Sequence, residues 1–364
     1  MDFTPTEEQA AAVDLAARIL GDHSTHQRLT AAGTGSDAGL WKELCAAGLV
    51  GAVADTGLLG LVLLLEEQGR VTAQVPFAAS CVYGLLAVAA HGSPEQRERL
   101  LPGIADGTVV VTGAISAAEA LPASVSPSGS PSPSPSPSPS PSPSVSGTLT
   151  GVLPAVPWLR DATHVLVADE SRRLWLVRTA EAAASEPVEL TAPWSAGRLS
   201  LDGTPGEALG AADAYEDLLA TARTAFAGLQ AGVCAGSLAR AVEHTNAREQ
   251  FGQPLAARQG VQLRAADAYM DTEAIRVTAY EAAWRRDEGL PYATHALTAA
   301  WWASEAGRRV VHTGQHLHGG AGADLGHPVH RHFLWGRQLD AYLGCGGELL
   351  QELGELIANG KVET

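Results

Sequence analysis

Glycines near the end of the sequence give one stretch the composition of a site for a phosphate-bearing ligand. Gly319, Gly320 and Gly322 follow a helical pattern, and a second helix is expected to begin within residues 327–335. Glycine lets a backbone approach a ligand closely, and a helix N-terminus attracts anionic groups. No Gly-Lys-Ser/Thr follows, which excludes a P-loop, and Leu325 stands where a Rossmann fingerprint needs its third glycine. Taken alone, the glycines fit a C-cap and a helix-to-helix turn better than a phosphate site.

Histidines are concentrated around the same glycines and raise the question of a metal site. His330 and His332 would point their rings apart on one helix, and no cysteine or aspartate set converges with them in the sequence. We therefore expect no metal and assign the histidines to polar packing and nucleotide contact. The residues concerned are His312, His316, His318, His327, His330 and His332.

The composition limits the partners of this chain. Its 364 residues carry a net charge of -16, and an acidic surface argues against nucleic acid or an anionic membrane as the main partner. The four cysteines are scattered without a CxxC pair, as in a reducing compartment. The polar N-terminus does not resemble a signal peptide, and the apolar run 58–65 is far shorter than the roughly 20 residues of a membrane span. A soluble, cytoplasmic protein is expected.

Helical patterns fill the sequence up to about residue 107. Capping signals precede two of the helices, at Thr6 and at Ser93. Pro102 and the glycine after it are expected to end the last of these helices at Leu101. The helices are predicted over residues 10–20, 40–47, 58–69, 79–91 and 94–101.

A β-rich segment follows in the middle of the chain. Residues 126–144 repeat Ser-Pro, a composition that cannot build a core, so an extended, solvated linker inserted into a loop is expected there. The turn Asp202-Gly203 is expected to follow the last strand. The strands are predicted over residues 108–112, 163–168, 173–177, 187–190 and 198–201.

Helical periodicity returns at residue 211 and continues to the end of the chain. Apolar residues recur at alternating spacings of three and four, which is the stripe of a packed bundle helix, and many small residues allow close helix approach. Helices are predicted over 211–246, 261–286, 295–317 and around 349–357. The expected fold class is α+β, with an N-terminal helical domain (1–107), a small middle β-domain (108–207) and a C-terminal four-helix bundle (208–364).

The order of segments and several motifs, above all the runs from Arg248 to Leu255 and from His316 to Gly322, resemble the acyl-CoA dehydrogenase family over nearly the whole chain apart from the Ser-Pro insert. The most specific motif is Arg248-Glu-Gln-Phe-Gly-Gln-Pro-Leu255, followed by Gln259 and Gln262. The second is His316-Leu-His-Gly-Gly-Ala-Gly322. Further runs that look like the family are Phe3 to Gln9, Trp41 to Leu44, Ala47 to Leu49, Glu66 to Arg70 and His91 to Gly103.

In this family FAD lies between two subunits, and the resemblance implies that both motifs reach the diphosphate and adenine half of the neighbour's FAD. Arg248 would contact the diphosphate, for which a fixed guanidinium is suited. The alternative for Arg248 is a surface ion pair with Glu249 or another acid. His316 stands where glutamine is usual. The implied FAD-binding residues are Arg248, Gln250, Phe251, Leu255, Gln259, His316, Gly319 and Gly320.

The catalytic positions depart from the family pattern. The usual base is a glutamate between tyrosine and glycine, where this chain has Leu343, and the minority position on the first bundle helix holds Ala222. The family's Thr-Glu-Pro-x-x-Gly-Ser-Asp segment, which holds the flavin ring, reads Thr112-Gly-Ala-Ile-Ser-Ala-Ala-Glu119 here. Asp340 and Glu348 lie nearby at the wrong spacing and are expected to be solvated helix charges. No catalytic residue is assigned.

The tail from His327 to Gly344 looks like the base-less subunits of heteromeric acyl-CoA dehydrogenases of actinobacterial steroid side-chain degradation. These assemblies pair two different family chains as α2β2 heterotetramers. The resemblance implies a subunit that completes the FAD site of a partner that carries the base, in the desaturation of an acyl-CoA. Two alternatives stay open, a self-sufficient homo-oligomeric dehydrogenase with a relocated base and a flavin-free scaffold on the same fold.

Overall fold

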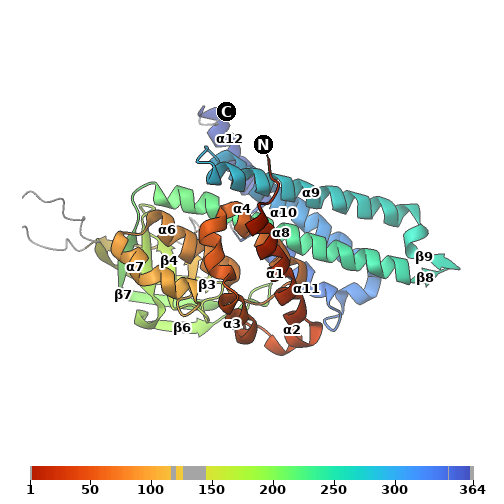
Figure 1. Cartoon of the computed structure of the whole chain (residues 1–364), viewed down its shortest axis with the longest axis horizontal. Helices are drawn as coiled ribbons and strands as arrows, with labels where there is room; N and C mark the ends of the chain where they lie inside the picture. The colour runs from red at the N-terminus through yellow and green to blue at the C-terminus, as the bar shows by residue number, and fades with distance from the viewer. Residues whose placement is uncertain (1, 116–119, 126–144, 343, 361–364) are drawn as a thin grey trace, which may run out of the picture.

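Two helical segments flank a sheet in the order of the chain. The computed structural model describes residues 2–115, 120–125, 145–342 and 344–360, so the predicted linker 126–144 lies outside the described residues. Figure 1 shows the sheet towards one end of the molecule and the long C-terminal helices extending towards the opposite end. The predicted α+β fold is confirmed. The division into domains at residues 107 and 207 stays a prediction.

The N-terminal helices begin where the sequence carries capping signals. The Thr6 hydroxyl accepts the N–H of Gln9 at 3.2 Å, the Gln9 side chain accepts the N–H of Thr6 at 3.0 Å, and Ser93 with Gln96 repeats this capping box. The sequence does not predict the short α2. The helices are α1 (Glu7–His23), α2 (His26–Ala32), α3 (Ala38–Ala46), α4 (Leu49–Val71), α5 (Phe77–Ala79), the π-helical η1 (Ser80–Leu86), α6 (Ala87–His91) and α7 (Pro94–Ala105).

α7 continues past Pro102, so the prediction that this helix ends at Leu101 is wrong. A proline inside a helix removes one hydrogen bond and crowds the preceding turn. The additional turn, however, buries the Ile104 side chain completely in the core. Burial of such a side chain stabilises by about 2 kcal/mol, which offsets much of the cost of the proline.

α4 consists of two helical segments joined at Gly57, whose φ of 72° and ψ of -166° interrupt the helix. The second segment begins at Leu58, as predicted. The Asp287 carboxylate accepts the N–H groups of Leu58 and Leu59, each at 2.8 Å, and so caps this segment. A Cβ at residue 57 would lie 2.7 Å from the same carboxylate. Glycine is therefore required both by the backbone angle and by the available space.

The middle of the chain forms a seven-stranded sheet in the order β1-β4-β5-β7-β3-β2, with β6 also paired to β7. β1 and β4 are parallel, and the other pairs are antiparallel. Val165 and Val177 are opposite each other on β4 and β5 and fully buried, which suits branched side chains on a pleated surface. The strands are β1 (Val111–Ala114), β2 (Ala123–Val125), β3 (Ser146–Val156), β4 (His164–Ala168), β5 (Leu174–Arg178), β6 (Ala184–Pro187) and β7 (Gly197–Leu209).

β7 runs through Asp202 and Gly203, where the sequence predicts a turn, so this prediction is wrong. The pairing of β3 with β7 shifts register at this point. Two residues of β7, Asp202 and Gly203, lie opposite the single residue Thr150 of β3. Gly203 has a φ of 58°, and its N–H donates to the Thr150 hydroxyl at 3.0 Å. The Asp-Gly pair therefore forms a bulge inside a strand. The predicted strand 187–190 is also displaced, because β6 ends at Pro187.

The C-terminal helices pack tightly against α4. At the crossing of α4 and α8, a Cβ at Gly69 would lie 2.2 Å from the carbonyl oxygen of Leu229, and a Cβ at Gly232 would lie 2.1 Å from that of Glu66. Small residues thus allow the close helix approach that the sequence predicts. The helices are α8 (Ala214–Ala247), α9 (Gln259–Asp287), α10 (Ala293–Leu317), α11 (Val329–Leu339) and α12 (Gly346–Ala358).

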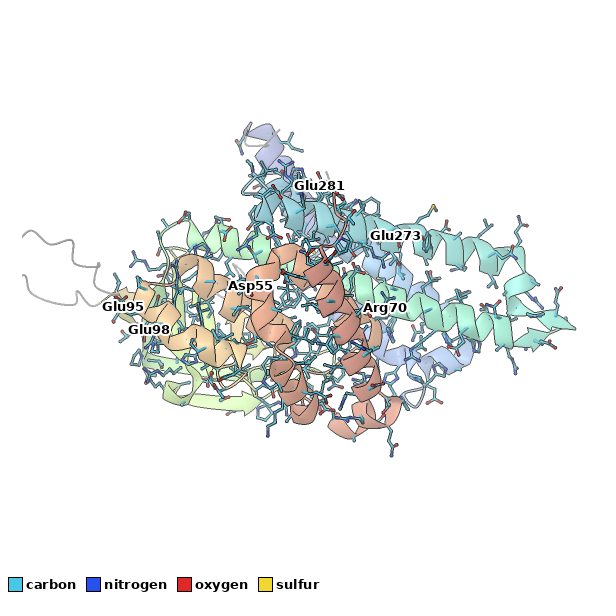
Figure 2. All side chains as sticks on the ribbon, in the orientation of Figure 1. Asp55, Arg70, Glu95, Glu98, Glu273 and Glu281 are labelled. Carbon is cyan, nitrogen blue, oxygen red and sulfur yellow. The ribbon has the colours of Figure 1, made fainter. Side chains whose placement is uncertain are left out.

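A buried ion pair joins α4 to α9. The Nε of Arg276 lies 2.9 Å from the Glu66 carboxylate, and Arg276 also binds Glu273, which Figure 2 labels on α9. Burial raises the pKa of Glu66, and the nearby Arg276 charge opposes this shift. The pair ties α4 to α9, because removal of either partner would leave the other side chain buried without its ion-pair partner.

α4 and α8 are long and apolar enough to cross a membrane by length and composition. Most of each apolar window is nevertheless buried by other parts of the chain, 67% for α4 and 72% for α8. This is the position of a core helix, which buries apolar residues all round its circumference.

Candidate functional site

A short hairpin after α8 carries the Arg248 motif. β8 (Glu249–Gln250) pairs with β9 (Gln253–Pro254) in antiparallel register. The two residues between the strands, Phe251 and Gly252, have φ of 56° and 78°. Left-handed backbone at both positions is the geometry of a type I′ turn. Figure 1 shows this hairpin at the end of the bundle that lies farthest from the sheet.

Phe251 stands almost entirely in solvent, with 89% of its surface exposed. Left-handed backbone costs a residue with a Cβ roughly 1–2 kcal/mol, and an exposed phenyl ring gains no burial in return. Both features indicate a ring that is held in place to meet a ligand or another chain. The Arg258 guanidinium lies 5.1 Å from the ring centroid. The sequence motif does not single out Arg258.

Arg248 is exposed at the start of the hairpin, and in the described ranges it forms no ion pair with Glu249 or any other acidic side chain. Its N–H donates to the His244 carbonyl at 2.8 Å, and its own carbonyl accepts the N–H of Leu255 at 2.9 Å. The backbone is therefore fixed while the side chain stays available. In a chain of net charge -16, an arginine clear of acidic partners is suited to an anionic ligand. The ion-pair alternative for Arg248 is not supported.

The glycine-rich turn after α10 folds into the short 3-10 helix η5 (Gly319–Ala323). Gly319 has a φ of 61°, and a Cβ at Gly322 would lie 2.3 Å from the carbonyl oxygen of Gln315. These glycines serve the turn itself, as the helix-to-helix interpretation predicts. A Cβ at Gly319 or Gly320 would meet no atom within 4 Å. The outer side of the turn is therefore open to a neighbouring molecule.

Histidine rings join the glycine turn to the hairpin. His318 is buried immediately before the turn, and its ring stacks on that of His244 with the centroids 4.6 Å apart. His244 lies one helical turn before Arg248. The His327 ring meets the His318 ring edge-on, with the centroids 4.9 Å apart. Burial lowers the pKa of His318, which favours the neutral ring in this stack. The two sequence motifs consequently lie at the same end of the bundle.

The other residues that the sequence predicts to bind FAD lie along this end of the bundle. Gln250 and Gln259 are exposed, and Leu255 is partly buried. His316 is exposed on α10, where it lines an open groove of about 890 Å³ between α9 and α10. The other charged or titratable residues of this groove are Arg264, Asp267, Asp271, Arg308, Arg309 and His312.

The hairpin and the turn fit the diphosphate and aromatic base of a dinucleotide such as FAD. Arg248 and Arg258 supply guanidinium groups that lack acidic partners among the described residues. Phe251 supplies an exposed aromatic face, and Gly319 and Gly320 leave the backbone accessible. Charge, stacking surface and open backbone are the three features by which proteins bind phosphorylated nucleotides.

Two further histidines pack against other parts of the described structure. His312 packs edge-on against Phe333 at 4.9 Å, and the Nε2 of His332 lies 3.0 Å from the Arg70 carbonyl oxygen. No three His, Cys, Asp or Glu side chains among the described residues are grouped to hold a metal ion.

Aromatic side chains fill the junction between the sheet and the bundle. Trp158 and Trp194 stack with their centroids 4.3 Å apart, and Trp194 meets Trp335 of α11 edge-on at 5.4 Å. Phe226 of α8 lies 4.7 Å from Tyr342. The pocket beside Phe226 and Tyr342 has a volume of about 20 Å³, which accommodates about one water molecule. Among the described residues, this pocket is too small for a flavin ring or an acyl chain.

Comparison with known proteins decides the family. The sequence matches "Acyl-CoA dehydrogenase, N-terminal domain" over residues 6–108 and "Acyl-CoA dehydrogenase, C-terminal domain" over residues 210–354. It is 31% identical to acyl-CoA dehydrogenase FadE27 of Mycobacterium tuberculosis, and the alignment covers 98% of this chain and 99% of that protein. This chain belongs to the acyl-CoA dehydrogenase family. Proteins of the acyl-CoA dehydrogenase family bind FAD.

Solved acyl-CoA dehydrogenase structures resemble this one along their whole length. A Tcur3481-Tcur3483 steroid ACAD variant superposes with a TM-score of 0.88 at 40% identity, over 98% of this chain and 99% of that chain. The ChsE4-ChsE5 complex from Mycobacterium tuberculosis gives 0.87 at 29% identity with the same coverage. Butyryl-CoA dehydrogenase from Megasphaera elsdenii, at 21% identity and a TM-score of 0.84 over 98% of this chain and 100% of that chain, shares the fold. The resemblance to heteromeric steroid acyl-CoA dehydrogenases is confirmed.

The two positions at which the family resemblance predicts a base hold Ala222 and Leu343 in the sequence. Leu343 lies outside the described residues, as do residues 116–119 of the altered flavin segment. Ala222 is fully buried on α8. The neighbouring Arg223 forms a two-pronged ion pair with Glu352 of α12, at 2.9 and 2.7 Å. The Glu352 carboxylate is thus held by an arginine.

Asp340 is not a solvated helix charge, so this prediction is wrong. Its side chain is only 14% exposed, its Oδ1 accepts the Ser304 hydroxyl at 2.6 Å and its Oδ2 pairs with Arg337 at 2.9 Å. The end of α11 packs against α10 and encloses it, which spacing in the sequence does not reveal. Glu348 is exposed and accepts the N–H of Cys345 at 3.1 Å, which caps α12.

Proposed function

We propose that this chain is the non-catalytic subunit of a heteromeric, FAD-dependent acyl-CoA dehydrogenase. It completes the FAD site of a partner subunit that carries the catalytic base, and the assembly introduces an α,β double bond into an acyl-CoA. One contrast within the chain carries the proposal. Aromatic side chains fill the junction between its own sheet and bundle, whereas its hairpin and glycine turn stand open.

The chain contributes binding groups and not a proton acceptor. Bound FAD supplies the chemistry of hydride acceptance from the β-carbon, and a carboxylate must take the α-proton. Leu343 and Ala222 have no group that accepts a proton, so the carboxylate comes from the partner. Arg248 opposes the negative charge of the diphosphate, and Phe251 offers its ring to the adenine. Gly320 lets the backbone approach the same half of the cofactor.

The substrate class is proposed from the relatives. The similar Tcur3481-Tcur3483 protein is named a steroid ACAD. A thioester of CoA with a steroid side chain is therefore the proposed substrate of the assembled enzyme, which we place in the cytoplasm. The net charge of -16 makes nucleic acid an unsuitable partner.

Flavin content measured by absorbance tests the proposal. The chain purified alone is expected to be colourless. Co-expression with a relative that carries the base is expected to yield a complex with roughly one FAD per pair of chains, because a shared site binds only when both halves are present. One flavin per isolated chain, together with activity on an acyl-CoA, would contradict the proposal and support a self-sufficient enzyme. A complex without flavin would support a scaffold.

Substitution of Arg248 tests the half-site directly. Arg248→Ala is expected to weaken FAD binding by the complex roughly 100-fold, because charge-assisted hydrogen bonds to a phosphate contribute about 1.5–3 kcal/mol each. Arg198→Ala, at an exposed arginine of β7, is the matched control and is expected to leave FAD binding unchanged. Equal FAD affinity of the Arg248 variant and the parent complex would rule out the proposed role.

A further inference from the structure

Arg258 has contacts that the function proposed above does not explain. It precedes α9, and its side chain folds back over the hairpin instead of extending into solvent. Its Nη2 donates to the carbonyl oxygen of Gln250 at 3.3 Å, and its guanidinium lies 5.1 Å from the centroid of the Phe251 ring. The single arginine thus holds both the last residue of β8 and the first residue of the turn.

These contacts restrict a ring that nothing else in the described structure supports. Phe251 forms no ring-to-ring contact with an aromatic side chain of the described residues, and most of its surface is in solvent. An exposed phenylalanine at a hairpin tip would otherwise change rotamer freely. A cation on one face of the ring fixes its orientation and leaves the opposite face uncovered.

The position of Arg258 also excludes two simpler roles. Its guanidinium makes no ion pair with an acidic side chain of the described residues, so it is not a surface salt bridge. It stands at the N-cap of α9 but forms no side-chain cap hydrogen bond there. Its Nε is buried without a hydrogen-bond partner among the described residues, which is a cost that the contacts with the hairpin must offset.

We propose that Arg258 is a positioning residue for cofactor binding. Its guanidinium holds one face of the Phe251 ring and the Gln250 carbonyl, so that the other face of the ring is presented to the adenine of the FAD that this chain shares with its partner subunit. This inference rests on the proposed function. It adds that the affinity contributed by Phe251 depends on Arg258.

A double-mutant cycle in the assembled complex tests this dependence. FAD affinity is measured by flavin fluorescence during reconstitution of the flavin-free complex, for Phe251→Leu, Arg258→Met and the double variant. Each single change is expected to weaken FAD binding about ten-fold, because stacking of a base on an aromatic ring is lost or loosened. The double variant is expected to resemble Phe251→Leu and not to reach the roughly 100-fold product that independent residues would give.

Two further measurements separate positioning from general structural damage. FMN lacks the adenosine half, so its affinity is expected to be equal in the parent and in Arg258→Met, whereas a damaged fold would weaken both flavins. Arg258→Lys keeps the cation and is expected to recover part of the FAD affinity. Arg198→Met, at an exposed arginine of β7, is the matched control and is expected to leave FAD affinity unchanged.

The outcomes distinguish this inference from the function on which it rests. Unchanged FAD affinity in Arg258→Met, or a double variant that reaches the product of the single effects, overturns the positioning role while Arg248→Ala still weakens FAD binding. Equal weakening of FAD and FMN by Arg258→Met also overturns it. If Arg248→Ala leaves FAD affinity unchanged, the proposed function itself fails.

Discussion

His332 is enclosed by the bundle, where its Nε2 lies 3.0 Å from the carbonyl oxygen of Arg70. Burial lowers its pKa from 6.5 to about 4. A folded-state pKa below the unfolded one means that the unfolded chain binds the proton more tightly. The neutral ring therefore makes its full contribution to the free energy of unfolding above pH 6.5, and this contribution is lost as the pH falls towards 4. We expect the free energy of unfolding to decrease by about 3 kcal/mol over this interval.

Urea unfolding at pH 7 and at pH 4.5 measures this effect. His332→Gln is expected to reduce the difference in unfolding free energy between the two pH values, because the variant has no group that titrates there. His316→Gln, at an exposed histidine, is the matched control and is expected to retain the full difference. A difference that persists in the His332 variant would assign the acid sensitivity to other groups.

Single residues were predictable from the sequence where a motif fixes the backbone around them. Arg248, Phe251 and the glycines lie at one end of the bundle, as the two motifs indicate, although their contact with FAD stays a proposal. The contact of Arg258 with Phe251 was not predictable, because it depends on the side chain folding back over a two-residue turn. The burial of Asp340 was missed for a different reason, since its partner Ser304 is 36 residues away in the sequence.

At the scale of an element, one side chain of α9, Asp287, caps the segment of α4 that begins after the break at Gly57. Asp287→Ala removes the acceptor for two N–H groups at the start of the second segment. We expect a loss of about 2 kcal/mol in unfolding free energy, because caps and charged hydrogen bonds each contribute on this scale. Denaturant unfolding measures it, with Glu288→Ala at the neighbouring exposed acid as the control. Equal stability of the two variants would show that solvent caps α4 adequately.

The boundaries of helices and strands were predictable where local sequence signals determine them. The predictions were wrong where tertiary packing determines them. Capping boxes and periodicity place α1, the start of α7 and the long helices α8, α9 and α10 within a few residues. The two wrong predictions, the end of α7 at Leu101 and the turn at Asp202-Gly203, have the same cause. Pro102 and the Asp202-Gly203 pair are normally breakers, yet α7 and β7 continue through them because neighbours in space hold the chain. β3 carries no strong pattern of its own and gains its length from pairing with β7.

At the scale of the whole molecule, the aromatic junction between the sheet and the bundle stabilises the fold. Trp194→Ala is expected to cost about 3–5 kcal/mol in unfolding free energy, as for other large core residues. It is also expected to leave the flavin content of the complex unchanged, because removal of one ring does not restore the flavin segment of the family. Trp301→Ala, at a partly buried tryptophan of α10, is the control for loss of an indole. A second flavin per pair would mean that side-chain volume alone closes this site.

The stacked indoles of Trp158 and Trp194 also have an optical consequence. Their rings lie 4.3 Å apart and 22° from parallel, close enough for their ultraviolet transitions to couple. Trp158 follows β3, Trp194 precedes β7 and touches Trp335 of α11, so the coupled pair sits where the sheet meets the bundle. The near-ultraviolet circular dichroism of this chain therefore reports on the packing of the sheet against the helical bundle. The measurement needs neither a dye nor the flavin.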